Sequence, residues 1–393
     1  MDVRVPEVPA SYDDYRRRVR EFVEAHKPEL RMKEKAGLRV PDDPEDVAKL
    51  RAWVRALNDA GFASPAHSET KLDPYQARVL NEELGRAGVS VVLGNPLVGG
   101  AIKLFGTDQQ KAFYLPRIAS GEHIWTQLFS EPAAGSDLAS LQTRGRLDGD
   151  GYVVDGQKVW STWAQFSDYG YLLARTENKP GPAGITAFIL DMKSPGVTTR
   201  PLREITGTTD FNEVFLDKVR IPVENVIGQP GQGWAVTTAS LAQERGGVGS
   251  RGAEDSIAGL IRIARATKRA GRPAIEDGAV RQAIARFAAR SRIQRALGYR
   301  VATKAAAKEL GPADAPLTKI WFSELNLEIN EYALSLQGPN GALAEGDPLA
   351  WQDGRFQDAF LYARAWTIAG GSNEIMRNLI AERGLGLPRE ARG

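Results

Sequence analysis

The spacing of apolar residues changes twice along the 393-residue chain, and that order of patterns restricts the fold more than any other feature of the sequence. Up to about residue 120 apolar residues fall at helical spacing, as in the run from Tyr15 to Val23. The next hundred or so residues hold short runs rich in β-branched and aromatic residues, and helical spacing returns from Trp234 almost to the end. A doubly wound α/β chain would alternate its helices and strands. We therefore predict an α+β protein with an N-terminal α-helical domain (1–122), a central β domain (123–230) and a C-terminal helix bundle (231–393).

Capping and turn residues mark the limits of individual elements. Asp43 and Pro44 predict the start of a helix that ends at Gly61, and Thr107 predicts the start of another. Asp-Gly pairs surround an alternating segment within residues 147–157, which predicts a β-hairpin. Further strands are predicted over residues 169–176, 185–192 and 211–221, and further helices over residues 234–267, 277–310, 316–336 and 356–369.

Charge and residue usage exclude several kinds of function. The chain has 51 Lys and Arg against 49 Asp and Glu, so no basic surplus is available for a nucleic-acid backbone or an anionic membrane. No stretch reaches about 18 uninterrupted apolar residues, and the segment after Met1 has no apolar leader, so we expect no membrane insertion and a cytoplasmic location. Cysteine is absent, and the three histidines, His26, His67 and His123, are too scattered for a metal site or a histidine-based triad. We therefore expect no metal, and acid–base chemistry that uses a carboxylate.

The usual phosphate-binding and esterase motifs do not occur. The glycine-rich segment 228–233 lacks the order G-x-G-x-x-G and follows a predicted strand outside any β-α-β unit, so we interpret it as a turn into the next helix. Neither a P-loop nor a G-x-S-x-G elbow with a usable histidine is present. Nucleotide hydrolysis and esterase chemistry are disfavoured.

Two segments carry residues suited to a planar, oxygen-rich ligand. In residues 128–137 small side chains would let backbone amides approach a ligand, and Ser130 and Ser136 add hydroxyl groups. Further along the chain, Trp160 offers a flat ring and Thr162 a hydroxyl group. Taken alone, the first segment is typical of a capped turn and the second of a strand packed in a core.

In this order and at this spacing the two segments resemble the acyl-CoA dehydrogenase family. Residues 128–137 match the family's signature of Ser, Glu, Pro, two small residues, Gly, Ser and Asp, and residues 158–162 match its Lys-x-Trp-x-Thr segment. Near the C-terminus, residues 369–378 resemble the family's last flavin-contacting stretch. The resemblance covers nearly the whole chain. It implies an N-terminal helical domain, a central β-barrel or sandwich domain and a C-terminal four-helix bundle.

The resemblance also implies a reaction, a cofactor and an electron acceptor. Family members remove a proton from Cα of an acyl-CoA thioester while hydride leaves Cβ for N5 of FAD, which gives a trans-2-enoyl-CoA, as in fatty-acid β-oxidation. Electron-transfer flavoprotein is the expected acceptor. By their place in the family's motifs, the residues that would contact FAD are Ser130, Ser136, Trp160, Thr162, Ser372 and Glu374, and those that would contact the substrate are Ser136, Arg245 and Gly370.

The general base expected from the resemblance is Glu244. Many members carry the base immediately before a Gly-Thr or Gly-Ser pair in the last stretch, but this chain has Gly370 there, which offers no proton acceptor. A subset that resembles isovaleryl-CoA and long-chain enzymes carries a glutamate in the first long helix of the C-terminal domain, and Glu244, followed by Arg245, matches that position. Apolar surroundings would raise the pKa of such a carboxyl group by desolvation. The alternative is that Glu244 is a solvated helix residue paired with an arginine.

The sequence departs from the family at the half-site that one subunit gives to its neighbour's FAD. The arginine expected there corresponds to Thr267, and the expected glutamine corresponds to Ser335, with Gln337 two residues further on. Some actinobacterial-type relatives, including those acting on steroid side-chain CoA esters, form α2β2 heterotetramers in which one chain supplies the base. The resemblance therefore implies either such a heterotetramer with a related chain or a homotetramer in which Arg265 or Arg269 replaces the expected arginine.

Two other functions stand as alternatives. A non-catalytic or flavin-poor partner subunit would share the fold, although Ser130, Trp160, Thr162 and Glu244 argue against it. A flavin oxidase or monooxygenase would differ in whether the reduced flavin meets oxygen. The sequence does not define the acyl group, and a base at Glu244 leaves room at Gly370 for branched, long or steroid-derived groups.

Overall fold

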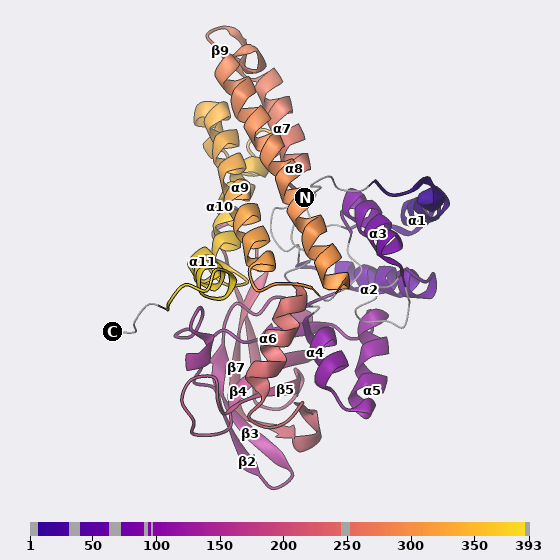
Figure 1. Ribbon diagram of the computed structural model, residues 1–393, viewed down its shortest axis with the longest axis vertical. Helices are drawn as coiled ribbons and strands as arrows, with labels where there is room; N and C mark the ends of the chain where they lie inside the picture. The colour runs from indigo at the N-terminus through magenta and orange to yellow at the C-terminus, as the bar shows by residue number, and fades with distance from the viewer. Residues whose placement is uncertain are drawn as a thin grey trace. The chain divides into compact units, whose positions relative to one another are not determined.

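The computed structural model describes residues 7–30, 40–62, 72–89, 93–95, 97–244, 252–307 and 309–389, without the side chains of residues 242–244, 252–254 and 306 (Figure 1). The described residues divide into two compact units, one that ends at Glu244 and one that follows it.

Helices come first in the unit that ends at Glu244. Their bounds are α1 Asp13–His26, α2 Pro44–Asp59, α3 Pro74–Ala87, α4 Leu97–Phe105 and α5 Asp108–Ala119. The Asp43 carboxylate accepts the N–H of Glu45 at 2.9 Å and caps α2, while Thr107 and Gln110 form a reciprocal capping box at α5. Both predicted helix starts are therefore confirmed. Apolar side chains of α1, α2 and α3 form one buried cluster, which includes Val19, Trp53, Leu57 and Leu84.

One eight-stranded sheet follows the helices. Its strands are β1 Trp125–Leu128, β2 Arg144–Asp148, β3 Gly151–Lys158, β4 Tyr169–Arg175, β5 Ile185–Asp191, β6 Val197–Leu202, β7 Phe211–Pro222 and β8 Val226–Ile227. The order is β6-β7-β3-β2-β4-β5-β8, and β1 pairs in parallel with β4. Asp148 pairs with Gly151 across the tight turn between β2 and β3, which confirms the predicted hairpin. The sequence pattern did not predict β1, β6 or β8.

Strands β4 and β5 are buried on both faces, which makes this part of the unit a three-layer arrangement. Leu173 and Ile189 pack against a cluster that includes side chains of α4, α5 and α6. Leu172 and Leu190, which alternate with them, pack instead against residues of β3 and β7. The predicted β domain is therefore a sandwich whose inner strands read as continuous apolar runs, with helices covering one side.

Helix α6, Gly233–Glu244, belongs to the same unit as the sheet. Its first residue lies so close to β5 that a Cβ atom on Gly233 would be 2.7 Å from the backbone of Thr186 and 2.8 Å from that of Ala187. Only glycine permits this approach. The start of α6 is therefore fixed to the sheet by direct backbone packing.

The second unit is a helix bundle. Its helices are α7 Gly252–Ala266, α8 Gly278–Ala306, α9 Asp314–Gln337, α10 Arg355–Ile368 and α11 Asn373–Leu379. Helices α7 to α10 lie side by side around one apolar core that contains Leu260, Phe287, Ile329 and Phe356 (Figure 1). This confirms the predicted bundle of four helices.

Two features of this region differ from the sequence-based prediction. The single helix predicted over residues 234–267 is two helices, α6 and α7, and residues 245–251 between them lie outside the described residues. A short hairpin, β9 Lys268–Arg269 and β10 Arg272–Pro273, joins α7 to α8, with Ala270 and Gly271 in the left-handed conformation its turn requires. Among the described helices, none combines the length and the apolar character that crossing a bilayer requires.

Candidate functional site

Trp160 follows the end of β3 and presents its indole ring to solvent. The residue is 59% exposed, and its backbone has a φ of 61°, in the left-handed region that a bulky residue rarely adopts. The edge of its ring contacts Phe211 at a centroid distance of 5.8 Å. A large apolar side chain held in water by an unfavourable backbone conformation indicates a binding surface. The interpretation of this segment as a strand packed in a core is wrong for Trp160.

Backbone hydrogen bonds fix the residues on both sides of Trp160. The N–H of Val159 donates to the carbonyl of Ser130 at 2.9 Å. On the other side, the N–H of Ser161 donates to the carbonyl of Asn212, and the side-chain amide of Asn212 donates back to the carbonyl of Ser161, both at 3.0 Å. The half-buried Ser130 and the exposed Trp160 are therefore neighbours.

The next residues turn back into the protein. Thr162 is half-buried, and its carbonyl accepts the hydroxyl of Thr126 at 2.8 Å. Trp163 also has a left-handed backbone, with a φ of 67°, but it is only 7% exposed and packs in the apolar cluster of α1, α2 and α3. The short segment from Trp160 to Trp163 thus presents one indole to solvent and buries the other.

A buried ion pair joins the two sequence motifs. Lys158, fully buried at the end of β3, donates to the Glu131 carboxylate at 2.8 Å and to the carbonyl of Phe129 at 3.1 Å. The carboxylate also accepts the N–H groups of Gln142 and Thr143. The sequence motifs include Glu131 and Lys158, but the sequence analysis did not predict that the two residues form an ion pair.

Burial and the opposite charge act differently on the two groups. Burial lowers the pKa of Lys158 to about 8, although the attraction of Glu131 opposes this shift. Burial acts to raise the pKa of the Glu131 carboxyl, but the charge of Lys158 and the hydrogen bonds outweigh it and hold that pKa below its usual value. At neutral pH both groups are therefore charged, in a place without access to water.

The rest of the first motif forms an open turn. Glu131 and Ala134 exchange backbone hydrogen bonds at 3.0 and 3.1 Å. Gly135 and Ser136 are exposed, and a Cβ atom on Gly135 would meet nothing within 4 Å. Ser136 lies on the same loop as Ser130, and its side chain is accessible to a ligand.

The predicted C-terminal site residues lie together in the second unit, in the turn between α10 and α11. Gly370 and Gly371 have φ values of 66° and 92°, and the Ser372 hydroxyl caps α11 by accepting the N–H of Ile375 at 3.4 Å. Glu374 is exposed in the first turn of α11. The hydrogen bond from its own N–H, followed by that from Ser372, lowers the pKa of the Glu374 carboxyl.

Buried polar groups hold this turn to α9. Asn373 is 4% exposed, and its side-chain oxygen accepts Lys319 Nζ at 2.8 Å and Ser323 Oγ at 3.0 Å. Lys319 also donates to the carbonyl of Thr367 at 3.2 Å. The sequence analysis missed these contacts, because nothing in the local pattern marks a lysine on α9 as the partner of Asn373.

The structure gives less information about the remaining predicted site residues. Glu244 is the last described residue of α6 and its side chain is outside the description, while Arg245 lies outside the described residues altogether. Thr267 follows α7 and precedes the β9–β10 hairpin, where its carbonyl accepts the N–H of Ala274. The exposed Ser335 uses its hydroxyl to donate to the carbonyl of Tyr332 at 2.8 Å.

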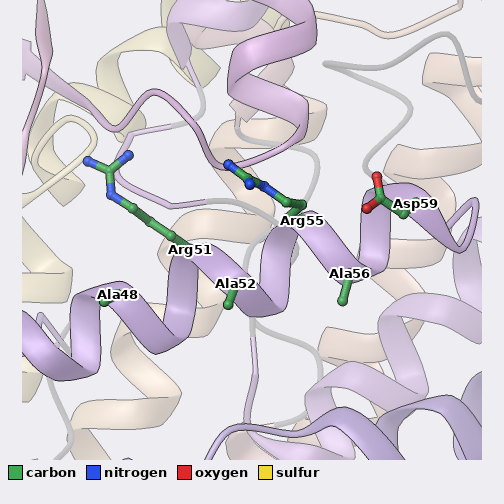
Figure 2. Close-up of a pocket in the computed structure, with 6 residues that line it drawn as sticks. All are labelled: Ala48, Arg51, Ala52, Arg55, Ala56 and Asp59. Atoms are coloured by element: carbon green, nitrogen blue, oxygen red, sulfur yellow. The ribbon is translucent and has the colours of Figure 1, made fainter.

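A shallow depression lies along α2, far along the chain from these motifs. Figure 2 shows Arg51 and Arg55 extending from the same side of the helix. Arg51 donates to the Asp168 carboxylate at 2.8 Å and to the carbonyl of Gly121 at 3.1 Å, so it ties α2 to the start of β4. Because a single helix supplies all the lining residues, the depression cannot enclose a planar ligand. The lining residues are Ala48, Arg51, Ala52, Arg55, Ala56 and Asp59.

Comparison with known proteins gives a consistent family. The acyl-CoA dehydrogenase N-terminal domain matches residues 10–122, the middle domain residues 126–219 and the C-terminal domain residues 231–385. Acyl-CoA dehydrogenase IpdE1 of Mycobacterium tuberculosis is 38% identical over 362 residues, which are 89% of this chain and 91% of that protein.

Solved structures agree over nearly the full length. The ChsE4-ChsE5 complex from Mycobacterium tuberculosis matches with a TM-score of 0.82 and 28% identity, over 98% of this chain and 100% of that one. The Tcur3481-Tcur3483 steroid ACAD matches with a TM-score of 0.79 and 28% identity, over 99% of this chain and 100% of that one. With all three domains matched in order, the chain belongs to the acyl-CoA dehydrogenase family.

Proposed function

We propose that this chain is an FAD-dependent acyl-CoA dehydrogenase that converts an acyl-CoA thioester into a trans-2-enoyl-CoA. The observation that carries the proposal is the exposed indole of Trp160, fixed beside Ser130 and Thr162 by hydrogen bonds on both sides. Bound FAD would accept the hydride that leaves Cβ of the acyl group.

The residues around Trp160 fit an isoalloxazine ring. The indole supplies a flat apolar face in solvent, where a stacked ring would cover it. The half-buried Ser130 and Thr162 flank it with hydroxyl groups, and Ser136 lies on an open turn close in sequence to Ser130. These groups would bind the pyrimidine edge, the region near N5 and the pyrophosphate respectively. By the family's motifs, Ser372 and Glu374 are also proposed FAD contacts.

Glu244 is the proposed base for the Cα proton. It ends α6, whose first turn packs directly on β5, so its backbone belongs to the same compact unit as Trp160. Val236, Thr237 and Ser240 along α6 are buried. A base carried by an anchored helix keeps its distance from the ring contacts, as proton abstraction requires.

The proposed substrates carry branched, long or steroid-derived acyl groups. Gly370 occupies the place of the family's more common base, and a Cβ atom there would meet nothing within 4 Å. One solved relative is named a steroid ACAD. Extra room at this place would suit a bulky acyl group bound through contacts that include Ser136 and Arg245.

The proposed assembly is an α2β2 heterotetramer in which this chain supplies the base. Thr267 and Ser335 stand where the family has a long donor, and the Ser335 hydroxyl is already bonded to its own helix. Each of the two solved relatives is named for two different chains. Electron-transfer flavoprotein is the proposed acceptor.

Two preparations test the proposal: the chain expressed alone and the chain co-expressed with a related chain. Each is titrated under anaerobic conditions with straight-chain, branched and steroidal acyl-CoAs while the visible flavin absorbance is followed. We expect bleaching by at least one acyl-CoA in the co-expressed preparation. A fully flavinated, active homotetramer from the chain alone would contradict the heterotetramer. Steady peroxide formation without an added acceptor would indicate an oxidase.

Replacing the proposed base gives the sharpest test of the mechanism. Glu244→Gln keeps the size of the side chain but cannot accept a proton, so turnover should fall at least ~10²-fold while the yellow flavin is retained. Glu331→Gln is the control, because Glu331 is an exposed helix glutamate paired with Arg364 at 3.1 Å. Turnover in Glu244→Gln equal to that of this control would remove Glu244 from the mechanism.

A further inference from the structure

We propose that the buried Lys158–Glu131 ion pair is a positioning device that sets flavin affinity, by holding the Ser130 turn in register with Trp160. The inference rests on the proposed flavin site. It assigns a role to two residues that are not themselves among the proposed flavin or substrate contacts.

The pair joins two segments that are 27 residues apart in sequence. Glu131 directly follows Ser130, and Lys158 precedes Trp160 by two residues. Lys158 also binds the carbonyl of Phe129 at 3.1 Å, so one ammonium group contacts the chain on both sides of Ser130. Ser130 and Trp160 therefore each lie within two residues of the ion pair.

The carboxylate extends the same network into a third segment. Glu131 accepts the backbone N–H groups of Gln142 and Thr143, which lead into β2. Lys158 ends β3, the partner of β2 in the hairpin. The Ser130 turn is thus held to the sheet edge from which Trp160 emerges, rather than to a mobile loop.

Trp160 needs such support because its backbone conformation is unfavourable. A left-handed φ at a bulky residue persists only where the surroundings enforce it. Asn212 fixes the chain after Trp160, while the bond from Val159 to Ser130 and the ion pair fix it before. Loosening the ion pair releases one of these three restraints and lets the indole and the Ser130 hydroxyl move apart.

As a source of stability only, the Lys158–Glu131 ion pair is energetically inefficient. Lys158 is 0% exposed and Glu131 is 6% exposed, and removing two charges from water offsets much of their attraction. Apolar residues of similar volume fill such sites with equal or better stability in other proteins. The pair imposes a geometry of four hydrogen bonds at one carboxylate and one ammonium, which apolar packing would not reproduce.

The test compares FAD binding in the double variant Lys158→Met/Glu131→Gln with that of the wild type. Glutamine keeps the volume of the glutamate and one of the two oxygens that accept the N–H groups of Gln142 and Thr143. Methionine keeps the apolar volume of the lysine stem. The matched control is Lys304→Met/Asp314→Asn, because Lys304 binds Asp314 at 2.8 Å and Asp314 also accepts a backbone N–H, from Gly311.

All proteins are stripped of flavin and titrated with FAD at a temperature well below their unfolding midpoints, so that loss of folded protein does not contribute. We expect the Kd for FAD to rise at least tenfold in the Lys158/Glu131 variant, about 1.4 kcal/mol. The control should change it less than twofold even where its unfolding midpoint falls. A Kd within twofold of wild type in the folded Lys158/Glu131 variant overturns the inference.

Where the double variant does not fold, Glu131→Gln alone is measured in the same way, since it keeps the volume of the side chain, one of the two acceptor oxygens and the lysine. An unchanged Kd in that variant also overturns the inference. Wild-type protein that binds FAD but is not bleached by any acyl-CoA would refute the proposed reaction, and the comparison of Kd values would still decide the role of the pair. Wild-type protein that binds no FAD in either preparation refutes both.

Discussion

Alanine and glycine at position 160 should rank in the reverse of their usual order. At most positions within a strand glycine is less stable than alanine by about 0.5–1 kcal/mol. At a φ of 61° an L-residue instead costs about 1–2 kcal/mol, which glycine avoids. We therefore expect Trp160→Gly to be more stable than Trp160→Ala by about 0.5–1 kcal/mol in the flavin-free protein.

The loss relative to wild type should also be small, and Trp163 provides the comparison. A fully buried tryptophan contributes roughly 5 kcal/mol at about 25 cal/mol per Å². Trp160 is 59% exposed, so less than half of this is lost, and relief of backbone strain returns about 1 kcal/mol. The net loss for Trp160→Gly is about 1 kcal/mol, against about 4 kcal/mol for Trp163→Gly, where the residue is 7% exposed and the backbone conformation is the same.

Urea unfolding of the flavin-free chain, followed by circular dichroism, measures these differences. A separate titration with FAD should show at least a tenfold weaker Kd for Trp160→Gly, because the stacking surface is gone. The reasoning fails if alanine proves more stable than glycine at position 160, or if Trp160→Gly loses as much stability as Trp163→Gly. An unchanged Kd for FAD would mean that the exposed indole serves some other contact.

Two further predictions concern charges that hold helices together. Burial acts to raise the pKa of Glu83, but Arg20, Arg16 and Arg86 bind its carboxylate and lower that pKa to about 2. The stabilising effect of the Glu83 carboxylate is therefore present above about pH 4.5 and is lost as the pH falls towards 2. Glu83→Gln should destabilise α1 and α3 by about 2 kcal/mol at pH 7, after allowance for solvent screening of the half-exposed arginines. Near pH 2.5 the loss should be much smaller, as measured by hydrogen exchange. A difference between wild type and variant that does not shrink on acidification would contradict this, and Glu21→Gln, which alters an exposed pair with Arg17, should have almost no effect. In the bundle, Asn373→Leu removes the oxygen that accepts hydrogen bonds from Lys319 and Ser323. It should lower the free energy of unfolding, measured in urea, by about 3 kcal/mol. A loss below 1 kcal/mol would show that other groups accept the hydrogen bonds of the lysine.

Local signals in the sequence were sufficient for much of the fold. Asp43 and Thr107 cap the helices they were predicted to begin, because a cap depends on residues three or four apart. The turn between Asp148 and Gly151 depends on its own residues in the same way. Strand β6 was missed because it has a polar alternation with no apolar face, and it becomes a strand by pairing with β7.

The site was less accessible to sequence reasoning. Ser130 and Trp160 were identified through resemblance, since exposure of an indole is decided by contacts elsewhere in the chain, with Asn212 among them. Lys158 and Glu131 were visible as residues, but their pairing depends on how β2 and β3 bring two segments together. Glu244 as the base stays a prediction, because its side chain is not among those described.

Because one indole is exposed and the other buried, the proposed flavin site is connected to the first hundred residues of the chain. Trp163 is a member of the cluster formed by α1, α2 and α3, and only two residues separate it from Trp160. A substitution that disturbs the packing of those helices would therefore also displace Trp160, the residue proposed to stack on the flavin ring. Substitutions such as a truncated Leu57 or Trp53, with no chemistry of their own, would be recognised at purification as colourless protein. Conversely, added FAD would protect these helices against heat, which makes the cofactor a reporter of how well the amino-terminal part of the chain has folded.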